Sequence, residues 1–351
     1  MIWGIVNMLS FKSCMLVLTS MFLAILPLGA KQPPPFGESI TWGTGKESPT
    51  LERLRGKSVL VVFFQSWCGI CNEWSPDFFA QMEKAYGDDT LVTLVALKTD
   101  GGSLDDAMSY LEGRTNTDHW LVGVDDNATY YRQATGDDKL YVYMWVKPDG
   151  SVGAVKKAGL YSSGSEPKEY VLATDRERQG IRKEAKPLMS FESPLDDALK
   201  PAIDLAERGL FLGALAEVAK LGSSSDLKED VAAFRKVIAE RLESAVERYT
   251  TAIGDETNEN RYLAYLALKR IEADFGASAP GQAAKTAVRV HSSAPWISEE
   301  KEAEKDYQSI MRRTARADDK RSRERIAKSL QKLAAEYPET YYGKMAEASE
   351  K

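Results

Sequence analysis

The chain has 351 residues, enough for two domains that each bury a hydrophobic core. Hydrophobic residues make up 43% of it, which excludes an intrinsically disordered chain and a protein with many membrane spans. The net charge is −6, and acidic and basic residues are mixed along most of the sequence. Because nucleic acids need a concentrated basic face, we expect no nucleic-acid partner.

Residues 1–30 differ in composition from the rest. Lys12 is the only charge among them, an apolar run covers Cys14–Leu28, and the small residues Gly29 and Ala30 follow. This order is typical of a secretory signal peptide. An uncleaved signal anchor is the alternative, although the run is shorter than the ~20 residues of a comfortable span. Both interpretations predict export to the periplasmic or extracellular side of a membrane, either secreted or anchored at the N-terminus.

A proline-rich tether at 31–38 leads into the first predicted domain, 39–164. Strand and helix patterns alternate through this domain, which predicts an α/β fold with a central mixed sheet flanked by helices. Apolar runs predict strands at 59–64, 91–97 and 120–124, helical spacing predicts helices at 71–86, 104–111 and 127–135, and a turn at Lys147-Pro148-Asp149-Gly150 predicts a hairpin of 140–146 with 152–158.

Strand patterns stop after Gly164, so 165–351 is predicted to be all-α. Helix starts are predicted at Ser193, Ser225 and Ser298, each followed by acidic residues.

Two segments of this region echo each other. An aromatic-ended helix pattern at 268–275, followed by Gly281 and Ala284, matches a second one at 330–337, followed by Gly343 and Ala346 at the same spacing. The echo resembles the helix–turn–helix boundary of tetratricopeptide-like repeats. A plain helical bundle is the alternative.

The residues with the clearest chemistry are Cys68 and Cys71, which are the only cysteines outside the leader. Two cysteines this close together close almost no loop, so a disulfide between them adds little stability. They follow a predicted buried strand and open a predicted helix, where free backbone N–H groups and the helix dipole favour a thiolate. Cys68 could then attack a substrate disulfide, and Cys71, one turn later, could resolve the mixed disulfide.

The run Val59–Phe64, the motif Trp67-Cys68-Gly69-Ile70-Cys71 and Pro76, five residues further on, resemble the thioredoxin superfamily. The additional helix and strand within Leu104–Val124 and the export signal are most similar to its secreted TlpA/ResA branch. The resemblance covers roughly 39–164. It implies that Cys68 is the nucleophile, that Cys71 is the resolving thiol, and that Trp67 shields the site and helps to form the docking surface.

Two positions depart from the family pattern. Val62 stands where the family has a buried acid, six residues before the nucleophile, which removes one proton acceptor for Cys71. The substrate-groove proline of the family should fall at Tyr141 or Val142, and neither is proline. Without proline a cis peptide bond costs about 3–4 kcal/mol, so we expect a trans loop and an altered groove.

Other interpretations of these residues stay open. The cysteine pair could be an inert disulfide on a degenerate fold. A zinc site is disfavoured, because structural zinc needs four ligands and only His119 and His291 would join the cysteines. Basic residues cluster at 312–325 among acids, which favours a solvated helix face over a patch for an acidic partner.

Together the patterns predict an exported thiol–disulfide oxidoreductase that acts on protein thiols or disulfides without a cofactor or metal. The pair Gly69-Ile70 lacks the histidine of strongly oxidising family members, which favours reduction over oxidation. Such an enzyme needs an electron donor, a membrane thiol reductase or another thioredoxin-like protein, and its helical domain would recruit a partner. The alternative is a non-catalytic thioredoxin-fold scaffold whose helical domain mediates protein–protein interaction.

Overall fold

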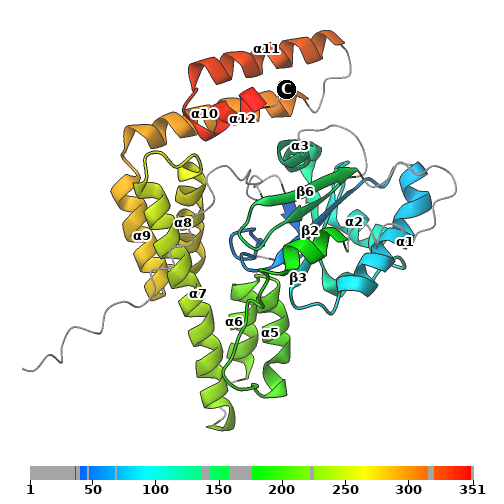
Figure 1. Cartoon of the computed structure of the whole chain (residues 1–351), viewed down its shortest axis with the longest axis vertical. Coiled ribbons are helices and arrows are strands. Elements are labelled where there is room, and N and C mark those ends of the chain that lie inside the picture. The colour runs from blue at the N-terminus through cyan, green and yellow to red at the C-terminus, as the bar shows by residue number, and fades with distance from the viewer. Residues whose placement is uncertain are drawn as a thin grey trace, which may run out of the picture. The chain divides into compact units, whose positions relative to one another are not determined.

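The computed structural model describes residues 36, 40–45, 47–67, 69–135, 142–157, 176–221, 225–314 and 320–348. Within 31–351 the chain forms one compact unit. Its strands all belong to the first half of the described chain and are followed only by helices (Figure 1). This order confirms the predicted fold class, an α/β part with a central mixed sheet and flanking helices followed by an all-α part.

In the described residues a six-stranded mixed sheet has the order β1-β4-β3-β2-β5-β6. Its central strands run parallel and are β2 (Ser58–Phe64), β3 (Val92–Lys98) and β4 (Trp120–Asp125). The predicted hairpin consists of β5 (Val142–Val146) and β6 (Val152–Lys157), and β5 pairs antiparallel with β2. The sequence patterns miss the short edge strand β1 (Ile40–Trp42), because three residues are too few for a periodic signal.

Helices cover both faces of the sheet. On one face α1 (Gly69–Tyr86) and α2 (Leu104–Leu111) bury alternate residues of β2, among them Val62 and Phe64. On the other face α3 (Thr129–Thr135) packs its tyrosines against Phe63. Since successive strand residues point to opposite faces, burial on both sides explains why β2 is a continuous apolar run.

In the described part of the second half of the chain, the helices α5 to α12 share one hydrophobic core. They are α5 (Lys200–Glu207), α6 (Phe211–Lys220), α7 (Lys228–Gly254), α8 (Arg261–Phe275), α9 (Ala279–His291), α10 (Pro295–Thr314), α11 (Lys320–Glu336) and α12 (Tyr341–Ala348).

Two predicted helix starts are wrong. Helical structure begins at Asp197 rather than Ser193, because the Asp196 side chain accepts the Ala198 N–H and provides the cap. The helix predicted at Ser298 begins at Pro295, since proline suits a first helical turn.

The two echoing segments have the same local geometry. A Cβ on Gly281 would lie 1.8 Å from the Phe275 carbonyl oxygen, and a Cβ on Gly343 would lie 1.8 Å from the Tyr337 carbonyl oxygen. Only glycine fits at such a distance, which is why each second helix crosses close to the aromatic end of the first. The assignment of these segments to a repeat family stays a prediction.

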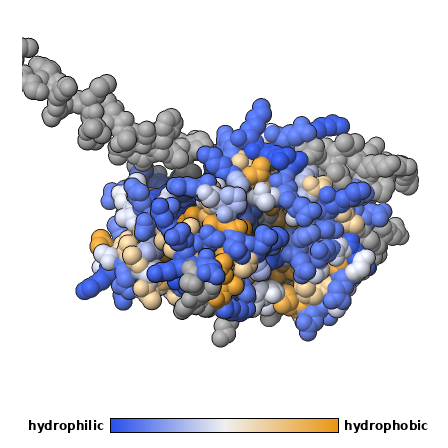
Figure 2. All heavy atoms as spheres, turned by 90° about the horizontal axis from the view of Figure 1, so that it is seen from below, coloured by the Kyte–Doolittle hydropathy of each residue, from blue (hydrophilic) through white to orange (hydrophobic). Residues whose placement is uncertain are grey.

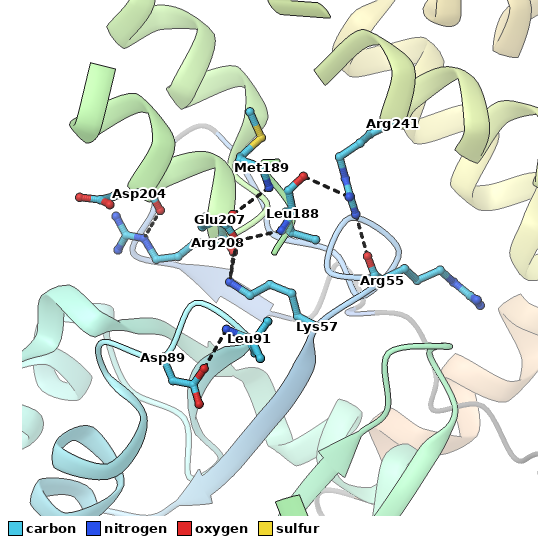
Figure 3. Close-up of polar contacts among 10 residues, drawn as sticks. All are labelled: Arg55, Lys57, Asp89, Leu91, Leu188, Met189, Asp204, Glu207, Arg208 and Arg241. Carbon is cyan, nitrogen blue, oxygen red and sulfur yellow. Dashed lines mark hydrogen bonds and ion pairs between the residues drawn. The ribbon is translucent and has the colours of Figure 1, made fainter. Parts of the chain in front are cut away.

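A buried ion pair joins the sheet to the helices (Figure 3). Lys57, directly before β2, places its Nζ 3.0 Å from Glu207 Oε2 at the end of α5, and its side chain is 2% exposed. The same carboxylate accepts the N–H groups of Leu188 at 3.0 Å and Met189 at 2.7 Å. Arg241 of α7 completes the junction by donating to the carbonyls of Leu188 and Arg55, at 3.1 and 2.7 Å.

A second junction has Glu47 at its centre. The Glu47 carboxylate accepts the N–H groups of Leu212 and Gly213 in the first turn of α6, at 3.0 and 2.8 Å. Arg53 lies 2.6 Å from Glu47 and also pairs with Asp274 of α8. Burial raises the pKa of Glu47, and the hydrogen bonds from α6 and the charge of Arg53 oppose this shift.

The Lys57–Glu207 pair lies at the amino end of β2, and Trp67 follows the carboxyl end of that strand. The seven residues of β2 span about 23 Å, so this pair is remote from the loop that contains Trp67.

None of the described helices is long and apolar enough to cross a membrane. On the face drawn in Figure 2, hydrophilic residues predominate and hydrophobic ones appear in small groups.

Candidate active site

The predicted redox motif lies at a strand–loop–helix junction. β2 ends at Phe64 and α1 begins at Gly69, so the loop between them leads from the carboxyl edge of the parallel strands into a helix. Cys68 lies outside the described residues. Gly69, Ile70 and Cys71 form the first turn of α1, and this first turn contains no acidic residue. Pro76 lies further along the same helix. This backbone arrangement places the second cysteine where free N–H groups favour a negative charge.

The loop before Cys68 is attached to the end of β3. The Ser66 N–H and hydroxyl both donate to Asp100 Oδ2, each at 2.9 Å, and the Gln65 amide donates to the Thr99 hydroxyl at 3.3 Å. The next residue, Trp67, is 68% exposed, which is rare for so large an apolar side chain. The loop is therefore held by its polar side chains while Trp67 faces solvent.

The position six residues before Cys68 is apolar in the fold as well as in the sequence. Val62 is 2% exposed and belongs to the core between the sheet and α1. Beside it on β5, the Tyr143 hydroxyl lies 3.3 Å from Glu177 Oε2. Burial, together with the nearby Glu177 carboxylate, raises the pKa of Tyr143, so this phenol stays protonated.

The two predicted groove positions are only partly described. Tyr141 lies outside the described residues, and Val142 is the first residue of β5, where it pairs with Lys157. Because β5 is antiparallel to β2, its first residue lies at the sheet edge where β2 ends.

The two histidines have unrelated neighbours. His119 Nδ1 lies 3.0 Å from Glu83 Oε1, and His291 packs edge-on to Trp296. Burial and the charge of Arg261 lower the pKa of His291. No group of three potential metal ligands occurs among the residues that the structure describes.

Ser66, Lys98 and Asp100 were missed as site residues by sequence reasoning. Lys98 is the last residue of β3, and its Nζ lies 2.7 Å from Asp100 Oδ1. Polar residues directly after a buried strand were the available signal, because the carboxyl ends of neighbouring parallel strands share one edge of a sheet.

No protein-family model matches the sequence, and a search of curated proteins finds no match either.

Several solved structures are similar to part of the chain. A candidate protein disulfide isomerase from Bacteroides thetaiotaomicron is 24% identical, covering 44% of this chain and 90% of its own, with a TM-score of 0.35. A thiol:disulfide interchange protein from Chlorobium tepidum is 18% identical over 44% of this chain and 97% of its own, with a TM-score of 0.32. A secreted disulfide oxidoreductase of Mycobacterium tuberculosis is 17% identical over 34% and 84%, with a TM-score of 0.27.

Proposed function

We propose that this protein is a thiol–disulfide oxidoreductase that acts on protein substrates through Cys68 and Cys71. The observation that carries the proposal is the course of the backbone. A buried strand ends four residues before the Cys68-Gly69-Ile70-Cys71 segment, and a helix begins within it. A thiolate at the amino end of a helix is stabilised by free N–H groups, and the exposed Trp67 beside it offers an apolar contact to a protein substrate.

The reaction consists of two exchanges. The Cys68 thiolate attacks one sulfur of a substrate disulfide, a mixed disulfide forms, and the other substrate sulfur leaves as a thiolate that takes a proton from water. Cys71, after losing its proton to water, then attacks the Cys68 sulfur and releases the second substrate thiolate. The substrate gains two electrons and the Cys68–Cys71 pair is oxidised to a disulfide, so a donor dithiol must reduce the enzyme again.

We place this chemistry outside the cytoplasm and in the reducing direction. The leader at 1–30 supports export, as a cleaved signal peptide or an anchor. The donor would be a membrane thiol reductase or another thioredoxin-like protein, and no further cofactor is needed for dithiol exchange. A fusion of 1–38 to a reporter enzyme that folds only after export tests the location, and a fusion that is made but stays inactive would contradict it.

Insulin reduction with dithiothreitol tests the activity. We expect Cys68→Ser to abolish the acceleration and Cys71→Ser to reduce it strongly, because the mixed disulfide then needs an outside thiol. Cys14→Ser is the matched control, since it removes a thiol outside the motif and should leave the rate unchanged. Equal rates for wild type and Cys68→Ser would favour the scaffold alternative.

Substrates can be identified by trapping. In Cys71→Ala the attacking thiolate stays bound to its client, because no resolving thiol is present. We expect mixed disulfides in the native envelope that dithiothreitol releases and that the double variant Cys68→Ser/Cys71→Ala lacks. An empty trap would count against protein substrates.

A second function has support from the surface of α11. Arg321, Arg325, Lys328 and Lys332 are exposed and recur at spacings of four, three and four, which puts them on one helix face. Such a face suits an acidic protein segment, and the scaffold alternative would use it.

A labelled polyglutamate peptide is the probe for this surface. Binding should weaken with salt and be lost in Arg321→Glu/Arg325→Glu. The matched reversal Lys285→Glu/Arg289→Glu, on an exposed part of α9, should bind as wild type does. Equal loss in both pairs would refute a specific surface.

A further inference from the structure

A buried pair of opposite charges lies beneath the loop that leads to Cys68. The side chains of Lys98 and Asp100 are 4% and 6% exposed, and Lys98 Nζ lies 2.7 Å from Asp100 Oδ1. The other carboxylate oxygen, Oδ2, accepts both the N–H and the hydroxyl of Ser66. One carboxylate therefore joins a buried cation to the backbone two residues before Cys68.

The surrounding residues hold Lys98 in this position. Its ammonium group also donates to the Gly101 carbonyl oxygen. A Cβ on Gly102 would lie 3.1 Å from Lys98 Nζ and 2.9 Å from Asp106 Oδ2, and Gly102 has a φ of +88°, so a side chain there is doubly disfavoured. Gly102 therefore leaves beside the Lys98 ammonium group the space that a side chain would fill.

We propose that Lys98 and Asp100 are positioning residues that hold the redox loop and set the ionisation of the Cys68 thiol. This inference rests on the proposed thiol–disulfide activity. Neither residue takes part in sulfur exchange. Asp100 fixes the loop through Ser66, and Lys98 cancels the negative charge that this arrangement places near the nucleophile.

The direction of the effect follows from charge. Cys68 comes two residues after Ser66, and two residues of chain reach at most about 7 Å, so with the length of the cysteine side chain the distance from Asp100 to the thiol is at most about 14 Å. At that distance an unpaired unit charge in a partly buried site shifts a pKa by roughly one unit. Lys98→Met would leave a negative charge and raise the pKa of Cys68. Asp100→Asn would remove a negative charge near the thiol and lower that pKa, and Lys98 would keep the Asp106 carboxylate as a neighbour.

A role in folding alone predicts something else. If the pair only supported the loop, both variants would loosen the same contact and shift the pKa of the Cys68 thiol in the same direction. Opposite shifts therefore separate electrostatic control from mechanical support. The double variant Lys98→Met/Asp100→Asn removes both charges and should return the pKa of Cys68 to within a few tenths of the wild-type value.

The test measures the rate of iodoacetamide alkylation against pH in the full chain with Cys14→Ser and Cys71→Ala, so that Cys68 is the only thiol. Below the pKa, a shift of about one unit changes the rate roughly tenfold. Asp89→Asn is the matched control, because Asp89 forms an ion pair with Arg178 close to the other end of β3. We expect no change in its profile.

Shifts in the same direction, or none, in Lys98→Met and Asp100→Asn would overturn the inference. If Lys98→Met fails to fold, Lys98→Arg decides together with Asp100→Asn. Lys98→Arg keeps the charge and should keep the wild-type pH profile of alkylation. If its profile shifts as far as that of Asp100→Asn, the inference is refuted. Insulin reduction by the otherwise unaltered chain is measured in parallel. If insulin reduction is absent, the proposed function is contradicted. If reduction is normal but neither variant shifts the pKa of Cys68, only this inference is contradicted.

Discussion

The Lys57–Glu207 pair allows a strong prediction about stability. Glu207 compensates a lysine whose side chain is 2% exposed, and it also accepts the two N–H groups of Leu188 and Met189. Burial lowers the pKa of Lys57, and the charge of Glu207 opposes that shift. The perturbation is Glu207→Gln, which preserves the shape of the side chain and removes its charge.

The expected loss of stability comes from the Lys57 charge, which remains buried without its partner. Removing one partner of a buried ion pair costs about 3–5 kcal/mol, because the other charge is left in a medium of low polarity. The glutamine can still accept one backbone N–H, so we expect the free energy of unfolding to fall by about 3 kcal/mol. Glu207→Ala also leaves both N–H groups without this acceptor, at about 1–3 kcal/mol each when they stay dry, so we expect about 5 kcal/mol.

Urea unfolding at neutral pH, followed by circular dichroism, measures these changes. Lys57→Met/Glu207→Gln should recover about 2 kcal/mol relative to the sum of the single variants, because no lone charge remains buried. The control is Asp204→Asn in the exposed Lys200–Asp204 pair, which should cost less than about 0.5 kcal/mol. If Glu207→Gln unfolds within about 0.5 kcal/mol of wild type, this reasoning about the junction is refuted.

Three further predictions concern single residues. Burial raises the pKa of Glu300 from 4.5 to about 7, with Glu299 and Glu304 adding to the shift and the Tyr341 N–H and Lys344 opposing it. A carboxyl whose pKa is higher in the folded state stabilises the fold below its unfolded pKa and loses that effect as pH rises through the folded pKa. The free energy of unfolding should therefore fall between pH 4.5 and about 7. Glu300→Gln should remove much of this fall and, above pH 7, be more stable than wild type by about 2 kcal/mol. Chemical unfolding measured across this pH range checks both expectations. Tyr130→Phe should raise the unfolding free energy by about 1 kcal/mol, because the hydroxyl is buried with no hydrogen-bond partner among the described residues; a loss of stability would contradict this. Gly281→Ala should lower the melting temperature and cost about 2–3 kcal/mol, since its Cβ would lie 1.8 Å from the Phe275 carbonyl oxygen, whereas Gly254→Ala meets nothing within 4 Å and should add about 0.5 kcal/mol; equal effects would show that the close approach does not matter.

Local patterns predicted most of the elements. The run 59–64, the helical spacing at 71–86 and the turn at Lys147–Gly150 each lie within a short window, and the structure has β2, α1 and the β5–β6 hairpin there. Helix starts at Ser193 and Ser298 failed because serine, acid and proline occur near many turns, and only one of several candidates becomes the cap. The cysteine motif was also a local signal, since its two cysteines are only three positions apart in the sequence.

The sequence by itself determined where most strands and helices form and which cysteines are candidates for sulfur chemistry, because periodicity and spacing are properties of neighbouring residues. Only the tertiary structure decided which charges meet. Ser66 and Asp100 are 34 positions apart, Lys57 and Glu207 are 150 apart, and Arg53 and Asp274 are 221 apart. Such pairs depend on strand register and on helix packing, to which distant parts of the chain contribute, so no local window of the sequence contains them.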